Sequence, residues 1–241
     1  MIIPKKSLGQ NFLKDKNIIN KINNIINFNN KTIVEIGPGL GFLTEKIIKK
    51  NPKKFIIIEK DEKLYDLLND KFKDYKNITI INDDIFNYNF NKLNNALIVS
   101  NLPYNISRKL IIKLIKLNKN IDEMIFMIQK ELSEKFNYNN GRMNKYKFLI
   151  KLFSEYQIYF DVSKNVFYPK PKVKSSVVGF KLKKVKINKN KLELFIKTIF
   201  TNNRKKIKNK INIKNNNLIK LKDKRIDELN IDDLFKVYKF F

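Results

Sequence analysis

The sequence predicts an α/β fold, in which a largely parallel sheet flanked by helices is followed by a small helical domain. Two observations predict it. Short apolar, β-branched runs alternate with segments of helical period, which is the pattern of a βαβ sheet protein. From about residue 189 onward the strand signals stop, and apolar residues recur at helical spacing. A chain of 241 residues suits one full domain and a small second one, so we expect domains over residues 1–185 and 186–241.

The elements of the first domain follow in order from these patterns. The predicted strands are 32–36, 54–59, 77–81, 96–100 and 123–128, and the helices between them lie near 42–50, 62–72, 108–117 and 130–136. The later runs 148–159 and 175–183 are predicted to form a hairpin pair that closes the sheet. The stretch Tyr168-Pro-Lys-Pro-Lys-Val leads into the second run. It is not expected to be helical, because proline lacks the backbone N–H that a helix needs.

The last part of the chain is predicted to form helices after a charged linker near residues 183–191. Two apolar sets recur there at the three- and four-residue spacing of an amphipathic helix. They are Leu192, Phe195, Ile196, Ile199 and Phe200, and then Leu229, Ile231, Leu234, Phe235 and Tyr238.

Several amino acids that carry common enzyme chemistry are absent. The chain has no cysteine, histidine or tryptophan, which excludes disulfides, thiol nucleophiles, imidazole bases and the usual zinc ligand sets. We therefore expect no metal site. No apolar run approaches the roughly 18 to 20 residues that span a bilayer, and the start of the chain offers no secretory signal. The expectation is a cytoplasmic protein without membrane contact.

The formal net charge of +28 is large enough to attract a polyanion, which for a protein of this kind usually means nucleic acid. A codon bias toward Lys, Asn and Ile offers a second explanation, since Ala96 is the only alanine. The distribution of charge is more informative than its total, because basic residues crowd one short stretch of the tail and suit RNA phosphates there. These residues are Arg204, Lys205, Lys206, Lys208 and Lys210.

A glycine-rich turn joins the first predicted strand to the first helix. Its spacing is Gly37-x-Gly39-x-Gly41, and such a turn lets backbone N–H groups approach a ligand closely. Phe42 stands where the dinucleotide fingerprint has its third glycine, which argues against NAD. Any βαβ turn can be glycine-rich, so the turn alone does not define a site.

Two acidic residues at the ends of the next strands make the turn more specific. Glu59 lies 22 positions after Gly37, at the end of the second strand, where a carboxylate can accept both hydroxyls of a ribose. Asp84 follows the third strand and is placed to hydrogen-bond the adenine end of the same nucleoside. The combination predicts a nucleoside without phosphates, and S-adenosylmethionine fits.

The segment Asn101-Leu-Pro-Tyr104 follows the next strand, at the sheet edge where open α/β proteins bind their ligands. An aromatic amine is a poor nucleophile, because its lone pair is delocalised into the ring. If the Asn101 side-chain oxygen and the Leu102 carbonyl accept its N–H groups, they favour the tetrahedral nitrogen that can attack a methyl sulfonium. Pro103 fixes the backbone, and Tyr104 is placed to stack on the base. The alternative is an ordinary turn, since Asn and Pro are common turn residues.

With these residues in place, the chain resembles the KsgA family of ribosomal RNA adenine dimethyltransferases. The resemblance covers nearly the whole sequence and is carried by six separated blocks in the same order. They are 6–13, 35–41, 101–107, 127–131, 167–175 and 203–207. It implies a Rossmann-like methyltransferase sheet, S-adenosylmethionine as cofactor and the small-subunit ribosomal RNA as partner.

The resemblance also assigns roles residue by residue. Asn11 and Leu13 would cap the cofactor site, and Phe167 would face Tyr104 across a flipped adenine, unless Phe167 is a core aromatic. The cofactor contacts that it implies are Gly37, Glu59, Asp84 and Asn101. Arg204, Lys205 and Lys206 would contact the RNA. The chain departs from the family at Lys174, where Asp is common, at Lys147, where Gly is usual, and in a shortened segment 137–143.

Two other functions remain open on the sequence. A relative that methylates large-subunit RNA and confers antibiotic resistance shares the chemistry, but such enzymes typically carry Ile where Leu102 stands. A non-enzymatic RNA-binding assembly factor would keep the fold while its cofactor loop or its Asn-x-Pro-Tyr loop is damaged, and both loops are whole here. The favoured interpretation is an rRNA (adenine-N6,N6)-dimethyltransferase that acts as a monomer in ribosome biogenesis.

Overall fold

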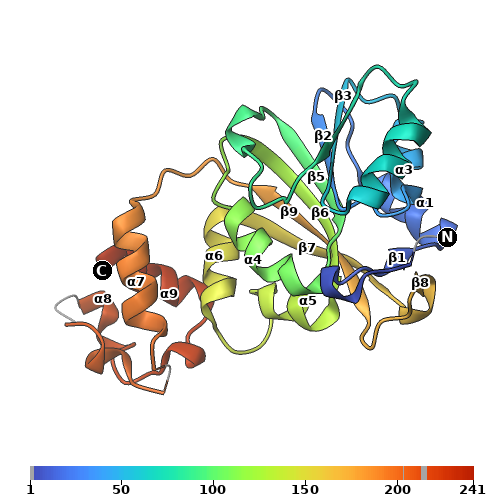
Figure 1. Cartoon of the computed structure of the whole chain (residues 1–241). Coiled ribbons are helices and arrows are strands. Elements are labelled where there is room, and N and C mark those ends of the chain that lie inside the picture. Colours follow the sequence, from blue (N-terminus) through green and yellow to red (C-terminus); the bar gives the residue numbers. More distant parts are fainter. Residues whose placement is uncertain (1–2, 203, 213–215) are drawn as a thin grey trace.

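The computed structural model describes residues 3–202, 204–212 and 216–241. Its centre is a seven-stranded sheet in the order β4-β3-β2-β5-β6-β9-β7 (Figure 1). The strands are β2 (Thr32–Ile36), β3 (Lys54–Glu59), β4 (Ile78–Asn82), β5 (Ala96–Asn101), β6 (Ile121–Gln129), β7 (Ser154–Val162) and β9 (Ser175–Leu182). The strands from β4 to β6 run parallel, and β9 pairs antiparallel with both β6 and β7. The predicted α/β class is confirmed.

Helices cover both faces of the sheet. On one face lie α1 (Lys16–Ile25), α2 (Phe42–Ile48) and α3 (Glu62–Phe72), and on the other lie α4 (Tyr104–Leu114), α5 (Lys130–Phe136) and α6 (Lys145–Phe153). Alternate strand residues supply the two cores: Ile33 of β2 belongs to one buried cluster, and its neighbour Val34 to the other. A strand covered on both faces has apolar residues at successive positions, as at Ile33 and Val34 of β2.

Most predicted elements of the first domain are confirmed. The strands at 32–36 and 54–59 and the helices at 62–72 and 130–136 have the expected bounds. The third strand is shifted by one residue, and α4 begins at Tyr104, four positions before the predicted start at residue 108. Pro103 precedes the first turn of α4, where its missing N–H costs nothing, and its carbonyl accepts the Ser107 hydroxyl. The proline stretch after Tyr168 is not helical, as predicted.

The prediction of a strand over residues 148–153 is wrong. These residues belong to α6, which begins after Asn144, whose side chain accepts the backbone N–H groups of Tyr146 and Lys147. The helix lies between the sheet and the C-terminal helices, so nearly every side is apolar, as in the buried residues Phe148 and Leu149. A helix that is apolar all round cannot be distinguished from a buried strand by periodicity. Only the second half of the run, β7, pairs with β9.

The helical tail is confirmed at both apolar sets, by α7 (Lys189–Phe200) and α9 (Ile231–Phe240), with the short α8 (Asn216–Ile219) between them. Leu229 lies just before α9 rather than in it. The tail packs on α6 through aromatic rings: the centroid of Phe148 lies 5.1 Å from that of Phe195 and 5.1 Å from that of Phe235. One buried cluster therefore continues from the sheet into the tail, and the division at residues 185 and 186 stays a prediction.

The N-terminal segment, which comprises residues 3–15, forms structure that the sequence patterns did not reveal. Asp15 caps α1 by accepting the N–H groups of Asn17 and Ile18. The strand β1 (Phe12–Leu13) precedes α1. It pairs antiparallel with β8 (Phe167–Tyr168), which lies far away in the sequence. Among the described residues, no helix is long and apolar enough to cross a membrane.

Candidate active site

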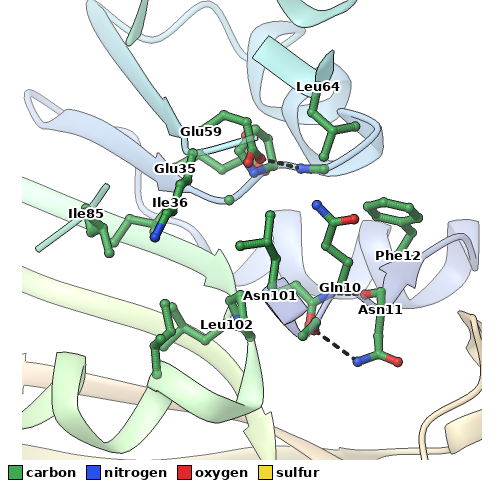
Figure 2. A pocket seen from close by; sticks show the side chains of 18 of the residues that line it. Gln10, Asn11, Phe12, Glu35, Ile36, Glu59, Leu64, Ile85, Asn101 and Leu102 are labelled. Atoms are coloured by element: carbon green, nitrogen blue, oxygen red, sulfur yellow. Dashed lines mark hydrogen bonds between the residues drawn. The ribbon is translucent and has the colours of Figure 1, made fainter. Parts of the chain in front are cut away.

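A pocket lies at the carboxyl ends of β2, β3 and β5, and the N-terminal segment forms its opposite wall (Figure 2). Figure 2 shows Glu35 and Glu59 on one side, Gln10 and Phe12 on the other, and Asn101 between them. The structure brings together nine residues proposed from the sequence: Asn11, Leu13, Gly37, Glu59, Asp84, Asn101, Leu102, Pro103 and Tyr104. It does not bring Phe167 or the basic tail into this pocket.

The glycine turn is open toward the pocket because of its backbone. Gly37, Gly39 and Gly41 all have positive φ, of 60°, 60° and 78°, which favours glycine. A Cβ on Gly39 would lie 2.8 Å from the Phe12 ring, so the turn also needs glycine to pack under the N-terminal segment. A Cβ on Gly37 would meet nothing within 4 Å. The space next to Gly37 is therefore available to a ligand.

Glu59 is held at the end of β3 with its carboxylate in the pocket wall. Its Oε1 accepts the Asp61 N–H at 2.8 Å, and its Oε2 accepts the Gly39 N–H at 3.4 Å. Burial raises the pKa of Glu59 above its usual range, and these two hydrogen bonds oppose the rise. The carboxylate keeps lone pairs for further donors, which suits two ribose hydroxyls.

Glu35 is a second buried carboxyl beside the pocket, and the sequence reasoning did not single it out as a site residue. Burial raises its pKa to about 8, a hydrogen bond from Thr44 opposes the rise, and the charge of Glu59 adds to it. The Thr44 hydroxyl donates to Glu35 Oε2 at 2.6 Å. A charged residue inside the otherwise apolar run of β2 was the available signal.

Asp84 lies at the pocket rim rather than in its interior. Lys60 Nζ donates to Asp84 Oδ2 at 2.8 Å, and the Phe86 N–H donates to Oδ1 at 2.9 Å. The Lys60 hydrogen bond is the main reason that the pKa of Asp84 is lowered. The carboxylate is therefore ionised at neutral pH and remains an acceptor.

The orientation of the Asn101 side chain is fixed by the N-terminal segment. Asn101 Nδ2 donates to the Asn11 carbonyl at 2.8 Å, which leaves Oδ1 as the acceptor of a side chain that lines the pocket. The Leu102 N–H donates to the Met127 carbonyl at 3.1 Å, so the loop is anchored to β6 as well. Within the part of the chain that the structure describes, no group donates to Asn101 Oδ1 or to the Leu102 carbonyl. Two acceptors are thus free at the same end of β5.

Tyr104 begins α4 beside these acceptors. Its hydroxyl shares a 2.7 Å hydrogen bond with the hydroxyl of Ser175, a fully buried residue at the start of β9. Burial raises the pKa of Tyr104, and the Ser175 hydrogen bond opposes the rise. Ser175 was part of a family block but had no assigned role. No sequence signal pointed to the contact, because 71 positions separate the two residues.

Phe167 is only 6% exposed and packs in the core cluster that contains α1 and α2. It pairs with Leu13 in the small sheet of β1 and β8. This placement agrees with the interpretation of Phe167 as a core aromatic. Its stacking on a flipped adenine stays a prediction.

Three residues that the sequence reasoning did not name hold the N-terminal segment over the pocket. Lys5 Nζ lies 2.9 Å from Asp61 Oδ2, and Gln10 Nε2 donates to the same oxygen at 3.0 Å. The Asp61 N–H also donates to Glu59 Oε1, so Asp61 holds both the N-terminal segment and the Glu59 carboxylate in place. Burial opposes ionisation of Asp61, but Lys5 and Gln10 outweigh it, and the pKa of Asp61 is lowered.

The basic residues of the tail lie at the opposite end of the molecule from β1 and β8 (Figure 1). Arg204, Lys205 and Lys206 are exposed. Asp223 partly neutralises this group, since its Oδ1 lies 3.4 Å from Lys206 Nζ and 2.7 Å from Lys208 Nζ. Asn203, the first residue of the last family block, lies outside the described residues. Among the described residues, no group of three or more acidic side chains is arranged to hold a metal ion.

A parallel sheet with a glycine turn, carboxylates at successive strand ends and an Asn-Leu-Pro-Tyr loop defines a Rossmann-like methyltransferase. Solved structures share this fold. A 23S rRNA methyltransferase ErmE matches with a TM-score of 0.80 and 19% identity, over 95% of this chain and 98% of that one. A dimethyladenosine transferase from Plasmodium falciparum matches with a TM-score of 0.76 and 23% identity, over 94% and 95%.

Sequence comparison gives the family. The family described as "Ribosomal RNA adenine dimethylase" matches residues 3–241, and the chain belongs to it. The protein named Ribosomal RNA small subunit methyltransferase A from Hydrogenobaculum sp. is 36% identical, over 99% of this chain and 93% of that protein. The protein of the same name from Sulfurihydrogenibium sp. is 38% identical, over 98% and 96%.

Proposed function

We propose that this enzyme dimethylates the exocyclic amine of adenosines in small-subunit ribosomal RNA, with S-adenosylmethionine as the methyl donor. One observation carries the proposal: two free acceptors, Asn101 Oδ1 and the Leu102 carbonyl, share a pocket with the buried carboxylate of Glu59. The family supports the reaction, and the names of the relatives support the small subunit.

The residues of the pocket fit the cofactor. Open space next to Gly37 accommodates a ligand against the glycine turn, and the oriented Glu59 carboxylate suits ribose hydroxyls. Asp84 at the rim suits the adenine end, while Asn11 and Leu13 cap the site from the N-terminal segment. When bound, S-adenosylmethionine supplies an electrophilic methyl group on a sulfonium.

The chain's own contribution to transfer is to prepare the amine. Asn101 Oδ1 and the Leu102 carbonyl accept the two N–H groups of the adenine amine and favour a tetrahedral nitrogen with an available lone pair. Gly37, Glu59 and Asp84 would hold S-adenosylmethionine, whose methyl group would be the electrophile for this lone pair, and sulfur would keep the electron pair of the carbon–sulfur bond. The proton leaves only after nitrogen has become positive, so no general base is needed before attack. A second round with fresh cofactor gives the dimethylated base.

The target base must leave its stack to reach the pocket, where Tyr104 is proposed to stack on it. Phe167, which lies outside the pocket in the small sheet of β1 and β8, is proposed to face Tyr104 across the base. Arg204, Lys205 and Lys206 are proposed to bind phosphates far from the pocket, helped by Lys208, Lys210 and Lys222 around a shallow surface depression. We further propose that the protein acts as a monomer in the cytoplasm, where its substrate is found.

The test is transfer of a labelled methyl group to small ribosomal subunits that lack the modification, followed by mapping of the labelled nucleotides. We expect dimethyladenosine in small-subunit RNA and none in large subunits treated in the same way. Label confined to large-subunit RNA would favour the resistance-type activity. Binding to subunits without any transfer would favour the non-enzymatic assembly factor.

A further inference from the structure

An exposed aromatic ring lies beside the candidate active site without a role in the proposed reaction. Tyr168 is 53% exposed although it belongs to β8, and Val173 a few residues later is 42% exposed. Pro169 and Pro171 separate them and restrict the backbone of the intervening chain. We call residues 168–174 the proline segment. It presents a ring on a stiff support, so stacking on the ring would cost little further conformational entropy.

The charge around this ring is positive. Lys14 Nζ lies 4.3 Å from the centroid of the Tyr168 ring, and Lys170, Lys172 and Lys174 are all exposed. None of these four lysines takes part in an ion pair within the described residues. The nearby carboxylate of Asp161 is already paired with Lys130.

Both ends of the proline segment are attached to the site. Tyr168 pairs across the small sheet with Phe12, and Phe12 lines the pocket. At the other end, Lys174 precedes Ser175, whose hydroxyl binds Tyr104 at 2.7 Å. Figure 1 shows β8 next to β1, on the side of the molecule that lies away from the tail. The proline segment is therefore tied at both ends to residues that line the pocket.

We propose that Tyr168 stacks on an unpaired RNA base next to the target adenosine, while Lys14 and the lysines of the proline segment bind the adjoining phosphates. Exposed aromatic rings flanked by lysines are a common way to hold single-stranded nucleic acid, because every base has a π-face. The inference rests on the proposed function for the presence of a target adenosine nearby. It adds a second RNA contact, separate from the basic tail.

The experiment compares three single variants in the full chain: Tyr168→Ala, Tyr168→Phe and Tyr75→Ala. Tyr75 is a matched control, since it is 47% exposed but lies after α3, outside the site. Equilibrium binding to unmethylated small ribosomal subunits is measured alongside S-adenosylmethionine affinity. We expect Tyr168→Ala to weaken subunit binding about fivefold or more, the range for loss of one stacked base, with cofactor affinity unchanged. Tyr168→Phe keeps the ring and should bind like the unmodified protein, as should Tyr75→Ala.

Ultraviolet crosslinking of the same complexes provides a second measurement. We expect a nucleotide adduct on the peptide that contains Tyr168, at a position next to the methylated adenosine. Equal subunit affinity for Tyr168→Ala and Tyr75→Ala, with no adduct on this peptide, would overturn the inference while methyl transfer by the unmodified protein upholds the proposed function. If the unmodified protein transfers no methyl group, the proposed function fails instead, and the binding comparison still decides whether Tyr168 contacts RNA.

Discussion

Asn101 depends on a backbone carbonyl 90 positions away for its orientation. If the Asn101 side-chain amide were rotated by half a turn, its NH2 group would replace Oδ1. The N–H groups of the adenine amine would then meet another donor and find no acceptor. The bond from Nδ2 to the Asn11 carbonyl prevents this, so the N-terminal segment sets the direction of the acceptor. At the scale of single residues, the direction of this one hydrogen bond therefore decides whether Asn101 can accept the amine.

Asn101→Ala removes one of the two acceptors that stabilise the tetrahedral nitrogen. We expect the variant to fold and to bind S-adenosylmethionine more weakly, with a turnover rate reduced on the order of a hundredfold or more, as for other preorganised hydrogen bonds. Single-turnover methylation of ribosomal subunits at saturating cofactor measures the effect. Near-normal turnover would show that Asn101 does not act in the transition state.

Glu59→Ala tests the ribose contact. The carboxylate is oriented by the N–H groups of Asp61 and Gly39, so its loss should weaken S-adenosylmethionine binding by roughly 1.5 to 3 kcal/mol, the range for hydrogen bonds to charged groups. Isothermal calorimetry measures this directly. Unchanged affinity would reduce Glu59 to a structural partner of the glycine turn.

Glu35 predicts a pH dependence of stability in the cofactor-free protein. Its pKa is about 8 in the folded chain and 4.5 in the reference state, so between these values the folded protein keeps a proton that the unfolded chain releases. The free energy of unfolding should therefore fall as pH rises through this window, by at most about 1.4 kcal/mol per pH unit from this group. The chain has no histidine to titrate in this window, and Glu59, whose pKa burial also raises, contributes in the same direction.

Glu35→Gln should remove this contribution, so the variant gains stability relative to the unmodified protein as pH rises from 5 toward 8. Urea denaturation of both proteins at several pH values measures the difference. A constant difference between the two proteins across this window would mean that Glu35 is ionised in the folded state.

At the scale of elements, the sequence predicts best where one local rule decides the structure. Strands β2 and β3 are correct because a short β-branched run ends in a turn or a polar residue. The error over residues 148–153 arose because burial on all sides removes the polar face that marks a helix, and this burial comes from the distant helices α7 and α9. The pairing of β1 with β8 and the contact between Tyr104 and Ser175 also join distant segments, so periodicity carries no signal for them.

Phe148→Ala tests whether α6 joins the tail to the sheet. The ring is fully buried and lies 5.1 to 5.4 Å from the rings of Phe195, Phe235 and Tyr238. Truncation should lower the free energy of unfolding by about 3 to 5 kcal/mol, the usual cost for a buried Phe. The matched control is Phe240→Ala, because Phe240 is 44% exposed and should cost far less. Chemical denaturation measures both variants. Equal losses of unfolding free energy would contradict the inference that α6 joins the tail to the sheet.

At the scale of the whole molecule, the pocket and the basic tail lie at opposite ends of one continuous structure. A flipped adenine fills only the pocket, so the tail is free to bind RNA phosphates far from the target base. Such a distant contact adds affinity without sequence selectivity, because phosphates are the same at every position. It also makes binding sensitive to salt, since each neutralised phosphate releases counterions.

Changing Arg204, Lys205 and Lys206 together to Gln should therefore weaken binding to the small ribosomal subunit and flatten its salt dependence, while S-adenosylmethionine affinity stays the same. Each phosphate that the tail no longer neutralises should reduce the slope of log affinity against log salt by roughly 0.7 to 0.9. The Lys206 contribution should be the smallest of the three, because Asp223 already lies 3.4 Å from its Nζ.

The matched control for the tail variant changes Lys49, Lys50 and Lys53 to Gln. These lysines are also exposed and carry the same total charge, but they lie before β3, at the end of the sheet away from the pocket. Filter binding over a range of salt concentrations compares the two variants with the unmodified protein. A larger loss of affinity and slope in the tail variant assigns the phosphate binding to the tail. Equal losses would mean that subunit binding follows the net charge of +28 and has no preferred surface.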